Sequence, residues 1–166
     1  MTKISKASIA DWKTIEQIAH QSWQHGYATV LSQAQIDFML QKSYSKNGIL
    51  EAMQQGHVFF ILTSESIPVG FVSLFFKTSD ILRIEKLYLL PEAQGKGLGK
   101  ELIDFASMQA KERACPIIEL NVNRSNKAYH FYLRQGFQVV QEIDIPYFGF
   151  VLNDYVMQKK VESYLS

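Results

Sequence analysis

Apolar positions recur at helical spacing in the first third of the chain. They predict a helix over residues 12–23, with Asp11 in the position of its N-cap. Two further helical stretches follow, over residues 33–41 and 46–54, and a short apolar segment at residues 3–8 suits a first strand. The pattern therefore predicts one strand and then three helices in a row.

The pattern changes to short apolar runs bounded by polar turns after residue 56. These runs predict strands at residues 57–63, 68–77 and 81–90. The remaining chain alternates, with helices at residues 98–111 and 125–135 and strands at residues 116–122, 137–143 and 150–158. This order predicts an α/β (α+β) domain, with a mixed, mainly antiparallel, twisted sheet of about seven strands flanked by helices on both faces. We expect residues 1–166 to form a single domain.

Composition and charge narrow the classes of partner. The 166 residues are 47% hydrophobic and 20% charged, as in an ordinary folded domain, and the net charge of +1 gives no electrostatic support for a nucleic-acid partner. The apolar runs are too short to span a membrane, and no signal-peptide core follows Met1. The single cysteine, Cys115, excludes an internal disulfide. We therefore expect a cytoplasmic protein without nucleic-acid or membrane partners.

Candidate chemistry first appears in a glycine-rich turn, Gln94-Gly95-Lys96-Gly97-Leu98-Gly99-Lys100, between a predicted strand and a predicted helix. Such a turn leaves backbone N–H groups unpaired at the positive end of the helix dipole. Glycine lets a phosphate approach the backbone closely, and the two lysines add positive charge. The heptapeptide therefore predicts a pyrophosphate-binding loop.

Spacing separates this turn from two nucleotide-binding motifs. A P-loop places Ser or Thr after its Gly-Lys pair, whereas Glu101 follows Gly99-Lys100 here. The dinucleotide fingerprint G-x-G-x-x-G would need a third glycine at Lys100 or at Leu102. Both motifs are therefore excluded.

The pattern Q-x-x-G-x-G, from Gln94 to Gly99, resembles the pyrophosphate loop of the GNAT superfamily of acetyl-CoA-dependent N-acetyltransferases. The preceding Leu87-Tyr88-Leu89-Leu90-Pro91 resembles the fourth strand of that family, and residues 126–137 resemble its N-x-x-A-x-x-x-Y-x-x-x-G-F segment. The asparagine stands one residue closer to Ala128 than is usual, so Ser125 or Asn126 fills the polar role. The resemblance covers the whole chain, most strongly residues 57–140. It implies the GNAT fold, with a gap between the fourth and fifth strands for pantetheine.

The resemblance also implies which residues bind acetyl-CoA, the expected co-substrate. Backbone N–H groups of the loop (Gln94, Gly95, Lys96, Gly97, Leu98, Gly99 and Lys100) would hold the pyrophosphate. The backbone of Leu87, Tyr88 and Leu89 would pair with pantetheine like an added strand, with the N–H of Leu89 near the thioester oxygen. Asn126 would contact pantetheine, although a helix cap suits it equally.

Tyr132 matches the family tyrosine that contacts the cofactor and protonates the departing thiolate. A phenol with a pKa of about 10 is neutral at physiological pH and can donate a proton. The same position in an amphipathic helix also suits core packing. The residue type therefore allows both roles.

The acceptor side is less specified. Glu85, two residues before Leu87, is the candidate base, although a surface ion pair with Lys77 or Arg83 suits it equally, and the resemblance also allows an ordered water in place of a base. The residues expected to border the acceptor are His25 and Tyr27 in the loop after the first helix, Tyr147 in the loop between the last two strands, and Glu85. No spacing suggests a metal site.

We therefore expect direct attack of a primary amine of a small molecule on bound acetyl-CoA in a ternary complex. Residues 145–157 look most like bacterial members near the polyamine acetyltransferases, so a polyamine is the first candidate acceptor and a protein or peptide N-terminus the second. A cationic acceptor favours an acidic pocket, for which the candidates are Glu85, Glu142, Asp144 and Asp154. A catalytically silent acyl-CoA sensor remains an alternative. A homodimer through the C-terminal strands would use Phe148, Phe150 and Tyr155, which could equally fill the core.

Overall fold

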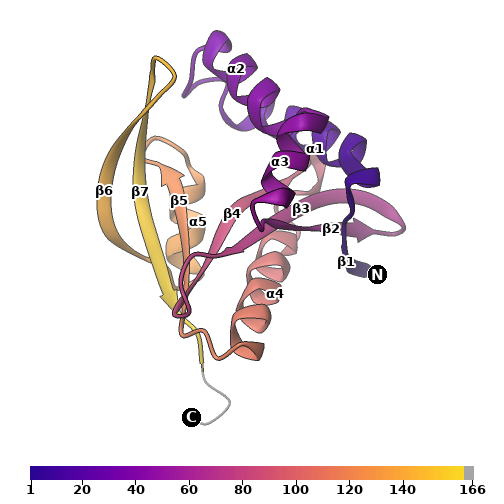
Figure 1. The fold of residues 1–166 in the computed structure, drawn as a ribbon, viewed down its shortest axis with the longest axis vertical. Coiled ribbons are helices and arrows are strands. Elements are labelled where there is room, and N and C mark those ends of the chain that lie inside the picture. The colour runs from indigo at the N-terminus through magenta and orange to yellow at the C-terminus, as the bar shows by residue number, and fades with distance from the viewer. Residues whose placement is uncertain (163–166) are drawn as a thin grey trace. The chain divides into compact units, whose positions relative to one another are not determined.

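The computed structural model describes residues 1–162, and its elements follow the predicted order (Figure 1). Seven strands form a mixed sheet in the order β1-β2-β3-β4-β5-β7-β6, which confirms the predicted fold class. The chain divides into two compact units. The first contains residues 1–75 and 86–103, and the second contains residues 76–85 and the chain from Asp104 onward. The single domain over residues 1–166 stays a prediction.

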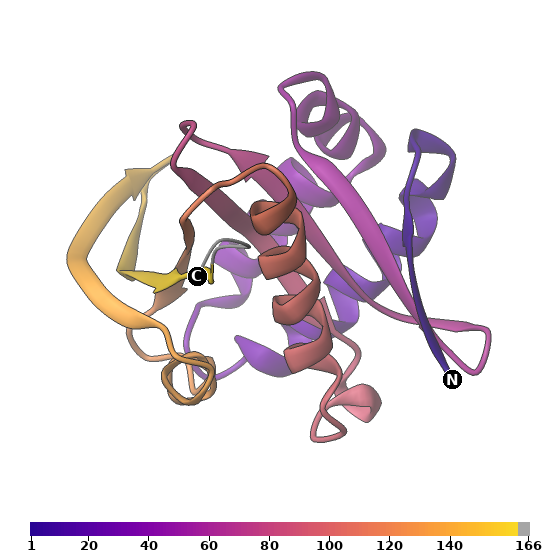
Figure 2. The same ribbon diagram turned by 90° about the horizontal axis from the view of Figure 1, so that it is seen from below.

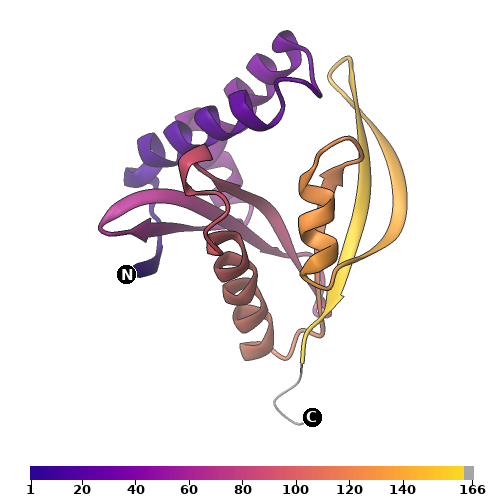
Figure 3. The same ribbon diagram turned by 180° about the vertical axis from the view of Figure 1, so that it is seen from behind.

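The first unit combines antiparallel strands with the first three helices. Its strands are β1 (Thr2–Lys6), β2 (Val58–Ser64) and β3 (Ile67–Phe76), and Figure 2 shows β1 beside the β2–β3 hairpin. Helices α1 (Trp12–Gly26), α2 (Gln33–Tyr44) and α3 (Lys46–Gln54) lie together over these strands (Figure 3). Fully buried side chains from both layers form its core: Ile15, Ile36, Ile49, Phe59 and Phe71.

Strand β4 (Ile81–Leu89) leads through the short 3₁₀ helix η2 (Pro91–Ala93) and the glycine-rich turn into α4 (Leu98–Glu112). The helix buries its apolar face at helical spacing, with Leu98, Leu102, Ile103, Ala106 and Ala110 all inaccessible or nearly so. The packing of this face fixes the start of α4 directly behind the turn.

The second unit is built around β5 (Ile117–Asn123). It pairs in parallel with the start of β4, Ile81 to Arg83 facing Ile117 to Glu119, and antiparallel with β7 (Phe150–Lys160). β6 (Gln138–Tyr147) pairs antiparallel with β7, and α5 (Ala128–Arg134) lies beside β5 (Figure 3). The gap between β4 and β5 implied by the family resemblance stays a prediction.

The start of the first helix differs from the prediction. Asp11 makes no side-chain cap for α1. Instead, the Ser8 hydroxyl accepts from the N–H of Ala10, and the Asp11 carboxylate accepts from the N–H of Ser8 at 2.9 Å. This capping box opens an unpredicted 3₁₀ helix, η1 (Ile9–Asp11), which runs into α1.

Candidate active site

The glycine-rich turn has the geometry of an anion cradle. Gly95 and Gly97 adopt φ of +77° and +79°, and a Cβ built on either would meet nothing within 4 Å. The space over the backbone is therefore open, and any side chain there would fill it. The N–H of Glu101 donates to the Gly97 carbonyl at 3.2 Å, which marks the first turn of α4. Backbone N–H groups in the first turn of a helix have no partner inside that helix. These features fit a pyrophosphate group.

The end of β4 is held closely by its neighbours. A Cβ on Gly70 would lie 2.9 Å from the Tyr88 carbonyl oxygen and 2.6 Å from the Leu89 side chain, so only glycine permits this approach of β3 to β4. The N–H of Leu90 donates to the Val69 carbonyl at 2.8 Å. These contacts leave little freedom for the backbone that is predicted to pair with pantetheine.

Ser22 adds a contact that the sequence did not predict. It is buried on α1, and its hydroxyl donates to the carbonyl of Leu89 at 2.8 Å. A serine among the apolar positions of the first helix was the available signal, because a buried hydroxyl needs a partner. Ser22 thus ties helix α1 to the end of β4.

Aromatic side chains of the first unit surround this strand end. The Trp23 ring lies 4.5 Å from that of Tyr27 and 6.1 Å from that of Tyr88, and the Lys86 ammonium lies 5.6 Å from the centre of the Tyr44 ring. Tyr27 caps the end of α1, as predicted for a residue between the first two helices. His25, expected in that loop, instead lies in the last turn of α1 and is exposed, because the helix continues to Gly26.

Two residues assigned to the cofactor lie around α5 in the second unit. The Asn126 side-chain oxygen accepts from the N–H of Ala128, the first residue of α5, at 2.9 Å, whereas Lys127 occupies the N-cap position itself. Ser125 is exposed. Tyr132 is only 8% exposed and its ring lies 5.8 Å from that of Phe137, so it does pack in the core. The roles of Asn126 and Tyr132 toward acetyl-CoA stay predictions.

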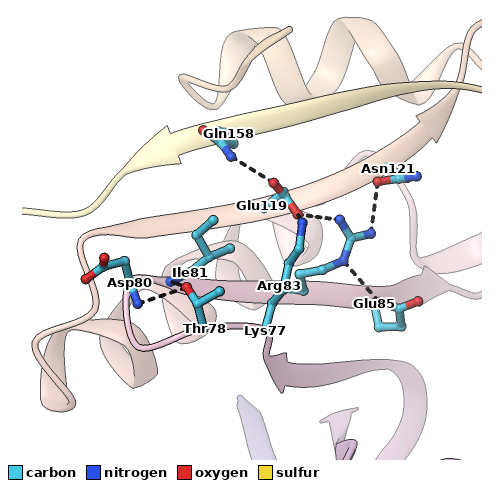
Figure 4. A network of polar contacts seen from close by, with 9 residues as sticks. All are labelled: Lys77, Thr78, Asp80, Ile81, Arg83, Glu85, Glu119, Asn121 and Gln158. Carbon is cyan, nitrogen blue, oxygen red and sulfur yellow. Dashed lines mark hydrogen bonds and ion pairs between the residues drawn. The ribbon is translucent and has the colours of Figure 1, made fainter. Parts of the chain in front are cut away.

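Glu85 belongs to a polar network centred on Arg83 (Figure 4). The Arg83 guanidinium donates from Nε to Glu85 at 3.2 Å, from Nη1 to Glu119, and from Nη2 to Asn121 at 2.9 Å. The ion pair between Glu85 and Arg83 was one of the alternatives for this glutamate. The Glu85 side chain is 35% exposed, and its Oε1 atom has no hydrogen-bond partner among residues 1–162. Its use as a base stays a prediction.

Glu119 is the most deeply buried acid in this network, with a side chain 3% exposed. Burial alone would raise its pKa. Hydrogen bonds from Gln158, at 2.7 Å, and Arg83, together with the charges of Arg83 and Lys77, outweigh burial and lower the pKa of this carboxyl. Glu119 therefore stays ionised and compensates the positive charge of Arg83.

The second unit contains a further charged group centred on Arg124, the residue after β5. Arg124 donates to Asp144 and to two backbone carbonyls, those of Ile143 and Asp154. The Asp154 carboxylate accepts from the Asn121 amide at 3.2 Å. Burial raises the pKa of Asp154 above its usual range, against the opposing effects of the Asn121 hydrogen bond and the Arg124 and Arg83 charges. Asp154 and Glu85 are thus linked through Asn121 and Arg83.

Tyr147 was predicted in the loop between the last two strands but is the final residue of β6. It pairs with Phe150, and only Phe148 and Gly149 form the turn, both with positive φ. This is the backbone geometry of a two-residue hairpin, which lets both strands run further than the apolar pattern indicated. Pro146 is tolerated because β6 is an edge strand.

The structure distributes the predicted site residues over the two units. The first unit contains the whole glycine-rich turn with Leu87, Tyr88, Leu89, His25 and Tyr27. The second contains Glu85, Asn126, Tyr132 and Tyr147. Each unit therefore contributes its own part of the proposed chemistry.

Other reactive groups are sparse over the described range. Cys115 is buried, and burial raises the pKa of its thiol, which suits a packing role. Within residues 1–162, no three His, Cys, Asp or Glu side chains are grouped to hold a metal. Over the same range, no helix is long and apolar enough to cross a membrane.

Comparisons with known proteins identify the family of this chain. The model of the acetyltransferase (GNAT) domain family matches residues 27–150. The chain is 31% identical over 169 aligned positions to the spermidine N(1)-acetyltransferase of Thermoplasma acidophilum, covering 97% of this chain and 98% of that one.

Solved structures extend the comparison. The PaiA N-acetyltransferase of Thermoplasma acidophilum, in complex with coenzyme A, superposes with a TM-score of 0.83 at 29% identity, covering 96% of this chain and 99% of the other. The ribosomal-protein-S18-alanine N-acetyltransferase of Escherichia coli shares the fold, with a TM-score of 0.74 at 17% identity over 98% and 95% of the two chains. From its family match and its nearly full-length relative, this chain belongs to the GNAT family and is an acetyl-CoA-dependent N-acetyltransferase.

Proposed function

We propose that the protein acetylates a primary amine of a polyamine, with spermidine as the first candidate acceptor. The observation that carries this proposal is the 31% identity, over nearly the whole of both chains, to a spermidine N(1)-acetyltransferase. The acceptor is accordingly a small cationic molecule. We propose no nucleic-acid or membrane partner.

The proposed chemistry needs a bound cofactor, a polarised thioester carbonyl, a deprotonated amine and a protonated thiolate. The loop from Gln94 to Lys100 holds the pyrophosphate through its backbone N–H groups. The backbone of Leu87 to Leu89 aligns the pantetheine chain, and the N–H of Leu89 stabilises negative charge on the thioester oxygen. The rigid support of this strand end by Gly70 and Ser22 favours such a role, because an oxyanion donor works best when it is pre-organised.

Proton transfer is assigned to the second unit. Tyr132 donates its phenolic proton to the departing thiolate, and Asn126 contacts the pantetheine. Glu85 takes the proton of the amine through an ordered water, which its partly exposed carboxylate can reach. His25, Tyr27 and Tyr147 border the acceptor. These assignments rest on the family resemblance and on the residue chemistry.

Release of free thiol from acetyl-CoA tests the proposal directly. Spermidine, spermine, putrescine, free amino acids and short peptides are compared as acceptors at one acetyl-CoA concentration. We expect the polyamines to have the highest kcat/KM. A clear preference for peptide N-termini would replace the polyamine with the second candidate acceptor.

A catalytically silent acyl-CoA sensor gives a different pattern. Acetyl-CoA would raise the melting temperature, but no amine in the panel would release thiol above the rate of hydrolysis. Mass spectrometry of the spermidine product completes the test, because a gain of one acetyl group identifies the transfer.

We further propose a cytoplasmic location and a homodimer. Use of acetyl-CoA supports the first. The second is supported by exposed apolar side chains on β7 and on the turn before it, with Val151 51% and Phe148 62% exposed. Light scattering at several protein concentrations checks the dimer.

A further inference from the structure

Each acidic side chain that accepts a hydrogen bond from Arg83, Asn121 or Arg124 in the second unit is paired with a cation, with one exception. Arg83 and Lys77 lie against Glu85 and Glu119, and Arg124 lies against Asp144. The exception is Asp154, which has no Lys, Arg or His nitrogen within 4.0 Å among residues 1–162. One carboxylate of this group is therefore left without a counter-ion.

Asp154 is nevertheless held in a defined orientation. The Arg83 guanidinium donates to the Asn121 side-chain oxygen at 2.9 Å, which turns the Asn121 amide nitrogen toward Asp154. One carboxylate oxygen, Oδ2, accepts from that nitrogen at 3.2 Å, and the other, Oδ1, has no partner within the described chain. Arg83 therefore orients Asp154 through Asn121. The charges of Arg83 and Arg124 also favour the ionised form of Asp154, but they do not offset its burial.

Partial burial raises the free energy of the ionised Asp154 carboxylate. An ionised carboxylate that is withdrawn from water needs a cation or several donors to compensate the lost hydration. The pKa of Asp154 is raised for the same reason, because burial destabilises the ionised carboxylate more than its neighbours stabilise it. An ammonium group supplies both the opposite charge and N–H donors.

The neighbouring acids fit this role less well. Asp144 is paired with Arg124, and Glu85 and Glu119 are paired with Arg83. Glu142, which faces Tyr155 across the β6–β7 ladder, is exposed to solvent, where water and salt weaken an ion pair. Among the acids surrounding Asp154, it alone is both sheltered and uncompensated.

We propose that Asp154 binds a non-reacting ammonium group of the polyamine acceptor, with Asn121 and Arg83 as positioning residues. This inference rests on the proposed function and deepens it. A polyamine presents one amine for acetylation and at least one more cationic group, and Asp154 gives that second charge a fixed partner. Asp154 thereby selects for acceptors with two separated charges.

The test combines an enzyme variant with a change of substrate. Asp154→Asn is compared with wild type using spermidine and butylamine, a primary amine without a second ammonium group. We expect the KM for spermidine to rise about tenfold, with kcat and the KM for acetyl-CoA changed less than about twofold. The KM for butylamine should stay the same, because that substrate has no charge to place against Asp154.

Two controls separate binding from structure. Glu112→Gln removes an exposed negative charge from the end of α4, outside the candidate site, and should change the KM for spermidine less than about twofold. Asp154→Asn also removes the uncompensated charge, so the melting temperature of the free protein should stay the same or rise. An equal loss with both amines, or a fall in kcat with unchanged KM, would overturn the inference in favour of a structural or proton-transfer role.

A thermal-shift titration distinguishes an error in the role of Asp154 from an error in the proposed polyamine acceptor. Spermidine should stabilise the wild-type protein with coenzyme A in a thermal-shift titration, and Asp154→Asn should abolish that stabilisation. If wild type turns over spermidine and both proteins have the same KM, only the role of Asp154 is wrong. If wild type neither turns over nor is stabilised by any polyamine, the proposed acceptor and the role of Asp154 are wrong together.

Discussion

The two units differ in the kind of group that they present for the proposed chemistry. The first unit presents backbone, namely the open turn at Gly95 and Gly97 and the strand end held by Gly70 and Ser22. The second presents side chains, in the network around Arg83 and in the buried ring of Tyr132. A site made of backbone groups suits a ligand that does not vary, such as the cofactor. A site made of side chains can be altered by a single substitution. In the proposed function, the positions of the pyrophosphate and pantetheine therefore depend on glycine and strand geometry, whereas the roles of Glu85, Asn126 and Tyr132 depend on residue identity.

The largest expected effect comes from blocking the backbone site. Gly97→Asp places a side chain and a negative charge in the open space above the turn, where the pyrophosphate needs both room and positive potential. We expect acetyl-CoA affinity, measured by isothermal titration calorimetry, to fall at least about 1,000-fold, or about 4 kcal/mol.

Gly149→Asp is the matched control for that change. Gly149 also has positive φ (+86°) and also has nothing within 4 Å of an added Cβ. Its acetyl-CoA affinity should equal that of wild type. Wild-type affinity in Gly97→Asp would show that the turn is not the pyrophosphate site.

Breaking the side-chain network should cost folding stability. Arg83→Met leaves Glu119 buried without its main partner, and removal of one member of a buried pair costs about 3 kcal/mol or more. The pKa of Glu119 is lowered by folding, so this stability is present above the pKa of an unfolded glutamate, about 4.3. It is lost as the pH falls through the folded value, so the penalty in urea unfolding should be full at pH 7 and shrink at pH 3.

Two companion variants test the cause of that loss. Lys77→Met removes a half-exposed lysine 3.3 Å from the same carboxylate and should cost less than about 1 kcal/mol. The double variant Arg83→Met with Glu119→Gln should be more stable than Arg83→Met alone, because it removes the buried carboxylate charge that has lost its partner. A double variant that is less stable would argue against charge as the cause.

Tyr132→Phe tests the one proton donor assigned to the second unit. Loss of a general acid lowers kcat by about 100-fold, or about 2.7 kcal/mol, while the ring that packs against Phe137 is kept. Acetyl-CoA affinity and melting temperature should stay close to wild type. Tyr129→Phe, in the same helix, is the control, and an unchanged kcat in Tyr132→Phe would remove Tyr132 from the mechanism.

The smallest expected effect concerns the support of the strand end. Ser22→Ala leaves the Leu89 carbonyl without its hydroxyl donor and should cost about 1 kcal/mol of stability. It should also lower kcat modestly, since the Leu89 end becomes less rigid. Ser73→Ala is the control, because Ser73 is equally buried but its hydroxyl has no hydrogen-bond partner within residues 1–162, so its removal should be neutral or stabilising. Equal losses in both variants would show that Ser22 acts only by filling space.

Much of the fold could be predicted because the signals are local. The third helix matches its predicted bounds, Lys46–Gln54, and the order of α-helices and β-strands is correct throughout. Errors arose where a local signal was assigned to the wrong element. Asp11 belongs to a capping box begun by Ser8, and the S-x-x-D spacing was present in the sequence. β6 continues past Ile143 because pairing with β7 decides its length.

The candidate site could be predicted unevenly for the same reason. The glycine-rich turn is contiguous, and its spacing alone indicated an anion site. Two partners of Arg83, Glu119 and Asn121, lie on a strand more than thirty positions later, and only the β4–β5 register brings them beside it. Ser22 likewise meets Leu89 across 67 positions of sequence. Contacts of this kind depend on how strands and helices are placed, which residue spacing does not contain.

The burial of Cys115 has a practical consequence for measurement. The only thiol of this chain is 1% exposed, and its raised pKa keeps it protonated and unreactive while the protein is folded. A colorimetric thiol reagent will therefore report coenzyme A released by turnover, without a background from the enzyme. Without substrates, the same reagent measures the rate of unfolding, because Cys115 is labelled only as fast as the protein opens.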